Sequence, residues 1–166
     1  MNKKIVVKVL NGLGIVIVGS VICVLLPLVL PKAFGYQVYG ILSNSMEPAI
    51  ATGSVVYVDN IDPNSIVDGD IITYKMGSDS NVVATHRVVS MDKDKKEFIT
   101  KGDNNRAVDA QPVSYERLLG KVVFTIPFLG EISTGIYSVN GIACIIILFS
   151  VAIAMWVGAD YLKNKK

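Results

Sequence analysis

One histidine and two cysteines are present among the 166 residues, and their scarcity restricts the chemistry open to this chain. Cys23 and Cys144 each lie inside an apolar run, where we expect them to act as small apolar side chains. The rest of the chain has no cysteine, which excludes a disulfide framework there. A lone histidine, His86, also argues against a zinc site, and no glycine-rich phosphate-binding loop is present. We therefore predict neither a metal nor a cofactor.

Charge is absent from two long stretches, residues 9–31 and residues 132–159. Each is long enough for the roughly 20 apolar residues that a helix needs to cross a bilayer. The first stretch also exceeds the apolar core of a cleavable signal peptide, which is about 7–15 residues long. We therefore favour a retained membrane helix over a removed leader, although residues 33–35 have the small-x-small pattern of a cleavage site.

The charges that are present divide the chain into four parts. Residues 32–131 carry 10 Lys and Arg against 13 Asp and Glu, whereas both ends of the chain are basic. Basic residues beside membrane helices stay on the cytoplasmic side, so we expect both termini in the cytoplasm of a cell-membrane protein. The basic isoelectric point then comes from the tails and gives no support to nucleic-acid binding. The predicted parts are an N-terminal transmembrane helix with a basic end (1–31), an extracytoplasmic domain (32–131), a second transmembrane helix (132–159) and a basic tail (160–166).

The segment between the two apolar stretches has the pattern of a β domain. Runs of β-branched and aromatic residues alternate with turns rich in Gly, Asp, Asn and Pro. Strands are predicted at 55–58, 71–74, 82–91, 97–100 and 119–124, with a short extended segment at 40–42 and a loop or short helix at 111–118. The predicted fold is a mainly β domain flanked by two transmembrane helices.

Three stretches of this middle part carry candidate chemistry. Ser45 is followed by Met46 and then by Pro48, which fixes its own backbone angle and restricts the chain after the serine. A serine hydroxyl needs an adjacent base, and His86 could take its proton while a carboxylate orients the imidazole. The stretch 101–109 supplies two carboxylates. A lone histidine on a strand can equally be structural, so these residues alone leave both interpretations open.

The sequences of the three stretches resemble those of type I signal peptidases. The motifs are Ser-x-Ser-Met-Glu-Pro from Ser43, Thr-His-Arg-Val from Thr85 and Lys-Gly-Asp-Asn-Asn-x-x-x-Asp from Lys101. A histidine in the second motif, where other bacterial members have lysine, is similar to the endoplasmic-reticulum and archaeal branch, which some Gram-positive bacteria also carry. Residues 120–130 resemble the closing segment of the family.

The resemblance implies a role for each matched residue. Ser45 corresponds to the nucleophile, His86 to the general base and Asp109 to the working acid, while Asp103 matches a second acid of the same motif. Which of the two aspartates contacts His86 stays open. Ser43 and the backbone N–H of Ser45 correspond to donors of an oxyanion hole.

The substrates implied by the resemblance are the signal peptides of secreted preproteins, cleaved after small residues at the surface of the bilayer. We expect the peptide to add as a strand at an edge near 41–42 or 82–85, with shallow pockets for its small side chains. Because a free histidine side chain has a pKa of about 6.5, activity should fall in mild acid. The sequence identifies no further partner protein within the membrane.

Two alternatives compete with this interpretation. One is a serine–lysine protease that uses Lys75 or Lys101 as its base. The other is a non-catalytic, membrane-anchored β domain that binds a partner protein.

Overall fold

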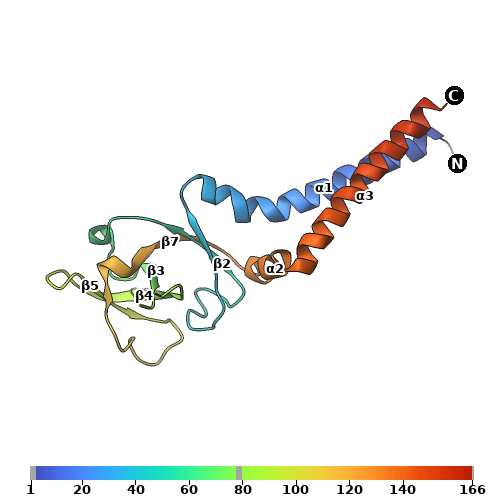
Figure 1. Cartoon of the computed structure of the whole chain (residues 1–166). Coiled ribbons are helices and arrows are strands. Elements are labelled where there is room, and N and C mark those ends of the chain that lie inside the picture. The colour runs from blue at the N-terminus through green and yellow to red at the C-terminus, as the bar shows by residue number, and fades with distance from the viewer. Residues whose placement is uncertain (1–2, 78–79, 166) are drawn as a thin grey trace. The chain divides into compact units, whose positions relative to one another are not determined.

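The computed structural model describes residues 3–77 and 80–165 (Figure 1). The chain divides into two compact units. One is the β unit, Leu30–Ser133, and the other is the helical unit, which combines Met1–Val29 with Thr134–Lys166. The prediction of a mainly β domain flanked by two long apolar helices is confirmed.

In the part of the chain that the structure describes, the β unit is built on one curled antiparallel sheet of seven strands. Their order across the sheet is β1-β2-β7-β3-β4-β5-β6, so β7, the last strand in the sequence, lies between β2 and β3. Short 3-10 turns occur at Pro63–Ser65 and Tyr115–Arg117. The strands are β1 (Gln37–Gly40), β2 (Val55–Asp59), β3 (Ile71–Lys75), β4 (Val83–Asp92), β5 (Glu97–Lys101), β6 (Val113–Ser114) and β7 (Leu118–Ile126).

Strand β4 is longer than its neighbours and pairs with each of them over a different half. Its first half pairs with β3, from Lys75↔Val83 to Ile71↔Arg87. Its second half pairs with β5 from Arg87 onward, with a bulge between Val88 and Ser90. The first half therefore has an edge that no strand of the described sheet occupies, and His86 lies in this half.

Two clusters of buried apolar side chains hold the β unit together. The first joins the central strands to the segment before β3 and to β6: Ile66, Ile72, Tyr74, Val88, Phe98 and Val113. The second joins the loop after β1 to β2: Ile41, Met46, Ile50, Val56 and Val58. Side chains two apart on a strand share a face, so His86 lies on the same face of β4 as the buried Val88.

The helical unit pairs two long helices, α1 (Lys3–Ala33) and α3 (Val139–Asn164). Their most apolar windows have mean hydropathies of 2.9 and 2.6, so both are long and apolar enough to cross a membrane. They run antiparallel, because Lys3 Nζ donates to the Lys165 carbonyl and Trp156 packs against Gly14. A Cβ added at Gly14 would lie 2.4 Å from Trp156 Nε1, which explains why glycine suits this crossing.

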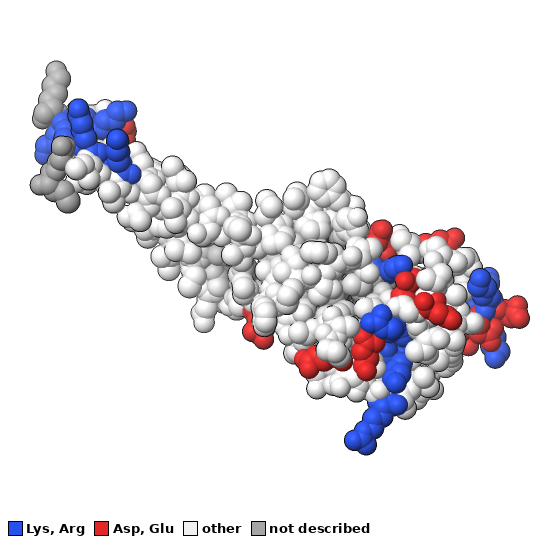
Figure 2. Space-filling model, turned by 180° about the vertical axis from the view of Figure 1, so that it is seen from behind, with Lys and Arg blue, Asp and Glu red and all other residues white. Residues whose placement is uncertain are grey.

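The surface of the helical unit carries few charges, as its apolar sequence implies. On the face that Figure 2 shows, the helical surface is uncharged except at one end, where basic side chains gather. Cys23 and Cys144 are exposed on these apolar helices. The second charge-free stretch is divided between α2 (Leu129–Ile136) and α3, and the Ser138 side chain caps α3 by accepting from the Gly141 N–H.

Candidate active site

Ser45 lies in the loop between β1 and β2, and the residue after it anchors that loop. The Met46 side chain is 1% exposed and packs in the second apolar cluster with Ile50 and Val56. The Met46 carbonyl also accepts from the Ile50 N–H at 2.9 Å, which closes a tight turn after the serine. Burial of the methionine therefore holds the neighbouring hydroxyl in place, as the bulky residue after the serine suggested.

The turn at Gly102–Asn104 holds the same loop from the other side. The Asn104 N–H donates to the Ser45 carbonyl at 2.8 Å, and Asn104 Nδ2 donates to the Asn44 carbonyl at 3.2 Å. Gly102 comes so close that an added Cβ would lie 2.7 Å from the Ser45 carbonyl oxygen. The glycine of the third motif is thus required by a close approach of two backbones.

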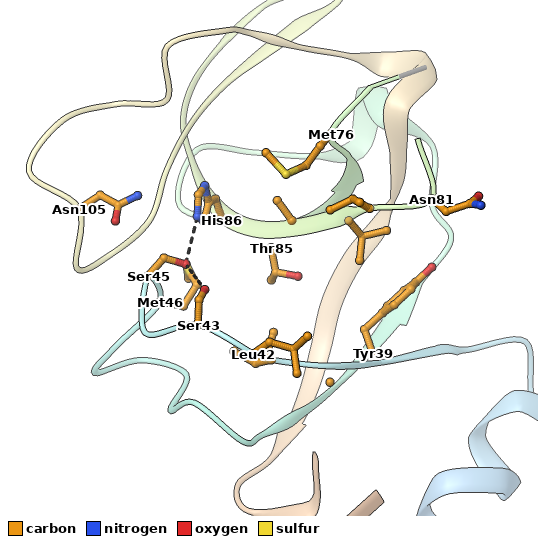
Figure 3. Close-up of a pocket in the computed structure, with 15 residues that line it drawn as sticks. Tyr39, Leu42, Ser43, Ser45, Met46, Met76, Asn81, Thr85, His86 and Asn105 are labelled. Carbon is orange, nitrogen blue, oxygen red and sulfur yellow. Dashed lines mark hydrogen bonds between the residues drawn. The ribbon is translucent and has the colours of Figure 1, made fainter. Parts of the chain in front are cut away.

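His86 lies between Ser45 and Asp109 (Figure 3 shows the serine contact). Its Nε2 is 3.2 Å from Ser45 Oγ, and its Nδ1 is 2.6 Å from Asp109 Oδ2. The His86 side chain is 14% exposed and that of Asp109 is 20% exposed, so the pair is largely withdrawn from water. Three stretches that are distant in sequence therefore meet in the order hydroxyl, imidazole, carboxylate.

Asp109 Oδ2 is also the acceptor for two hydroxyl groups. Thr100 Oγ1 donates to it at 2.6 Å and the Tyr74 hydroxyl donates at 3.1 Å. Burial by itself raises the pKa of Asp109, but the hydrogen bonds from Thr100 and His86 outweigh it, and the pKa is lowered. Burial raises the pKa of Tyr74 to about 12, so its hydroxyl keeps its proton and stays a donor.

Asp103, the other carboxylate of the third motif, binds Arg87 instead of His86. Arg87 Nε and Nη2 donate to its two oxygens at 2.8 and 2.6 Å, and Arg87 Nη1 donates to the Gly69 carbonyl at 2.8 Å. The hydrogen bond to Asp103 raises the pKa of Arg87. Of the two aspartates that the sequence left open, Asp109 is the one in contact with the imidazole.

The remaining candidates can also be placed. Ser43 Oγ lies 3.3 Å from Ser45 Oγ (Figure 3). Within the described residues, Ser45 Oγ is hydrogen-bonded to His86 and Ser43, and neither Lys75 nor Lys101 contacts it, which disfavours the serine–lysine alternative. Over the same residues, no group of three or more His, Cys, Asp or Glu side chains is arranged to hold a metal ion.

A groove of about 520 Å³ begins at Ser45 and His86. Figure 3 shows these two residues at one end of it and Tyr39 and Asn81 at the other. One wall is formed by residues 39–43, which continue from β1, and the other by residues 82–86, at the start of β4. The groove is thus bordered by two extended segments.

Four residues of the site were missed from the sequence, for different reasons. Arg87 stands inside the second motif and Thr100 directly precedes the third, so their positions in the sequence were a usable signal. Asn104 stands inside the third motif, but its contact with the Ser45 loop is visible only in three dimensions. Tyr74 lies on another strand, and its approach to Asp109 depends on strand register, which the sequence does not give.

Known proteins are similar to this chain, although no family model matches it. It is 39% identical over 122 residues to Signal peptidase I W of Bacillus subtilis, a match covering 67% of this chain and 63% of that protein. It is 34% identical over 122 residues to the signal peptidase complex catalytic subunit SEC11 of Scheffersomyces stipitis, covering 63% of this chain and 72% of that protein. The human subunit SEC11C is 34% identical over 114 residues, 66% of this chain and 57% of that protein.

The matches span less than two thirds of the Bacillus and human proteins but more than two thirds of the Scheffersomyces subunit. The relatives come from a bacterium and from eukaryotes, and all carry names of one enzyme family. The chain belongs to the type I signal peptidase family, in the branch that includes the SEC11 subunits.

Proposed function

We propose that this protein is a membrane-bound serine endopeptidase that removes signal peptides from secreted preproteins. The observation that carries the proposal is the chain of contacts from Ser45 Oγ to His86 Nε2 and from His86 Nδ1 to Asp109, at 3.2 and 2.6 Å. These distances suit proton transfer from a hydroxyl to an imidazole that a carboxylate orients. Membership of the signal peptidase family supplies the class of substrate.

In the proposed acylation step, Ser45 Oγ attacks the carbonyl carbon of the scissile peptide bond while its proton passes to His86 Nε2. The tetrahedral intermediate then collapses and the carbon–nitrogen bond breaks. The leaving amine takes the proton from His86, and the signal peptide stays attached to Ser45 as an ester. Asp109 holds the imidazole and stabilises its cationic form throughout.

Water completes the cycle in the deacylation step. His86 accepts a proton from the water as it attacks the ester carbonyl, and the proton then returns to Ser45 Oγ as the ester bond breaks. The signal peptide leaves as a carboxylate. The same imidazole therefore serves as base and acid twice, which is why its contacts with both neighbours matter.

Ser43 and the backbone N–H of Ser45 are the proposed donors to the negative oxygen of the intermediates. The 3.3 Å separation of the Ser43 and Ser45 hydroxyl oxygens supports this assignment, because the carbonyl under attack must lie beside Ser45 Oγ. One such donor is worth about 3–4 kcal/mol in the transition state. Asp103 is proposed to act on the site indirectly, through Arg87.

The groove suits an extended peptide. Residues 83–86 have one edge paired with β3 and the other facing the groove, so a substrate strand can hydrogen-bond to their backbone. Near Ser45 the buried side chains of Ile41, Met46 and Thr85 occupy the space beneath the groove. They favour small residues at the cleavage site, because little depth is left for a bulky side chain.

The proposed topology has both termini in the cytoplasm and the β unit outside. Both helices are long enough to cross, and Lys3 lies beside the Lys165 carbonyl, so the two basic ends belong on one side of a membrane. A cysteine introduced at exposed Asp94, with both native cysteines replaced, should react with a membrane-impermeant reagent on intact cells. Labelling only after lysis would reverse the proposed orientation.

Cleavage of a reporter preprotein tests the activity. Ser45→Ala and His86→Ala should each lose about 10⁴-fold or more, and Asp109→Ala about 10²–10⁴-fold, because the three act as a unit. Bulky residues at the reporter's cleavage site should block processing by the wild type. Unchanged cleavage by the folded Ser45→Ala protein would refute Ser45 as the nucleophile, and absence of cleavage by the folded wild type would favour the non-catalytic binding domain.

A further inference from the structure

We propose that Tyr74 and Thr100 are positioning residues that hold the Asp109 carboxylate against His86 and thereby fix the position of the imidazole proton. The inference rests on the proposed function for its consequence in catalysis. Its structural part, the state of the imidazole, can be measured without any substrate.

The two hydroxyls and the imidazole converge on a single oxygen. Asp109 Oδ2 accepts from Thr100 Oγ1 at 2.6 Å and from the Tyr74 hydroxyl at 3.1 Å, and it lies 2.6 Å from His86 Nδ1. Thr100 also holds the backbone of Asp109, because its carbonyl accepts from the Asp109 N–H at 2.8 Å. The aspartate is therefore held at both its main chain and its side chain.

Both donors are rigidly placed by the sheet. Tyr74 is 5% exposed and Thr100 is 1% exposed, and they stand on β3 and β5, the strands that flank β4. The register pairs Tyr74 with Ala84 and Thr100 with Val88, two residues before and two residues after His86. All three side chains consequently share one face of the sheet. The Tyr74 ring also meets the imidazole edge-on, with centroids 6.3 Å apart.

A second cavity beside Asp109 leaves room for its carboxylate to turn away from His86, and the two hydroxyls oppose that movement. It has a volume of about 280 Å³ and lies against Asp109, His86 and Tyr74, with Gln111 and Arg117 in its lining. An aspartate held only by the imidazole has room to turn toward this cavity. Arg117 also bonds to the Met76 and Pro112 carbonyls, so it fixes the chain beyond Asp109 and leaves the carboxylate itself to Tyr74 and Thr100.

The orientation of Asp109 decides which nitrogen of the imidazole carries the proton. A carboxylate at Nδ1 keeps the proton there and leaves Nε2 free to accept the proton of Ser45. If Asp109 turns away, the proton can move to Nε2, and the imidazole can no longer act as the base toward the serine. Thr100 thus acts through Asp109, and Tyr74 acts both through Asp109 and through its own contact with the imidazole, since its hydroxyl oxygen lies 3.4 Å from His86 Nδ1.

Because His86 is the sole histidine, nitrogen-15 labelling of histidine gives one pair of ring signals that report its state. In the full-length wild type at mildly alkaline pH, we expect a protonated Nδ1 and an unprotonated Nε2. The double variant Tyr74→Phe, Thr100→Val should shift the two signals toward each other or exchange them. Tyr115→Phe is a matched control, because its buried hydroxyl has no hydrogen-bond partner in the described residues.

Kinetics on a reporter preprotein give the second measurement. The double variant should lose about tenfold or more in kcat with KM within about twofold, since hydrogen bonds to a charged group are lost without a change in the groove. In the Tyr74→Phe background, Thr100→Ser should retain much more activity than Thr100→Val, because serine keeps the hydroxyl. Tyr115→Phe should match the wild type in both measurements.

Two results would overturn the proposal: wild-type ring signals in the double variant, or equal changes in the Tyr115→Phe control. Should the double variant not fold, the single variants Tyr74→Phe and Thr100→Val provide the same comparison. If the wild type cleaves no signal peptide, the proposed function fails, and the ring signals still decide whether the two hydroxyls position Asp109.

Discussion

Arg87 binds both carboxylate oxygens of Asp103, with Nε at 2.8 Å from Oδ1 and Nη2 at 2.6 Å from Oδ2. The arginine directly follows His86 on β4, and the aspartate belongs to the turn that holds the backbone of Ser45. This ion pair therefore connects the base to the loop of the nucleophile. A planar, two-point contact of this kind fixes orientation as well as distance.

Breaking that ion pair should reduce activity by misplacing Ser45 relative to His86. We expect Asp103→Asn and Arg87→Gln each to lower kcat/KM about 10–100-fold, since small misplacements in an active site have large effects on rate. The loss in the double variant should be smaller than the sum of the single losses, with a coupling of about 1–2 kcal/mol in transition-state stabilisation. Strictly additive losses would show that the two residues act separately.

Gly102→Ala should impair catalysis more than it impairs folding. The new Cβ would lie 2.7 Å from the Ser45 carbonyl oxygen and from Asn105 Nδ2, so the serine loop or the turn must move. We expect kcat/KM to fall about 100-fold while the thermal midpoint drops by only a few degrees. Gly77→Ala is the control, because its Cβ would make an ordinary 3.6 Å contact with Ser80. Equal activity in the two variants would contradict the close-approach argument.

The rate of cleavage should fall as the solution becomes mildly acidic. His86 must be neutral to accept the proton of Ser45, so an imidazole that is protonated in acid cannot act as the base. The pH profile of kcat/KM, measured on a folded enzyme checked at each pH, should therefore show one protonation on its acid side. A rate that stays constant down to pH 5 would exclude His86 as the base.

Asp109 should contribute to stability in a pH-dependent way. Its pKa is lowered in the folded protein: burial opposes ionisation, but the hydrogen bonds from Thr100 and His86 outweigh it. The contribution is therefore present above the unfolded value of about 3.9 and is lost as the pH falls through the lower folded pKa. The difference in unfolding free energy between wild type and Asp109→Asn, from denaturant titrations, should be largest near neutrality and narrow toward pH 2. A difference in unfolding free energy that becomes larger in acid would contradict this prediction.

The sequence predicts the strands of this protein well because each combines β-branched residues with flanking turns. The prediction at 82–91 differs from β4, Val83–Asp92, by one residue at each end. The extended segment predicted at 40–42 follows a strand that the pattern missed, Gln37–Gly40, which contains a single β-branched residue. Ile41 nevertheless continues the pairing, since its N–H donates to the Ser54 carbonyl at 2.8 Å.

The site was predictable where chemistry resides in short motifs and unpredictable where it depends on contacts between them. Ser45 and His86 stood out, because a restricted serine and a single histidine are visible in one dimension. The partner of Asp103 was not visible, because the choice between His86 and Arg87 depends on how the turn lies over β4. The sequence around Tyr74 predicts a strand but gives no sign of a role in the site.

Asp109 is bound at its N–H by the same residue, Thr100, whose hydroxyl reaches its carboxylate. The segment between Thr100 and Asp109 therefore begins and ends at the same place in the site. Its tip is exposed and consists of Arg106, Ala107 and Val108. Lengthening or shortening that tip should leave the acid where it is. A peptide tag inserted at that tip should therefore leave the geometry of the triad intact.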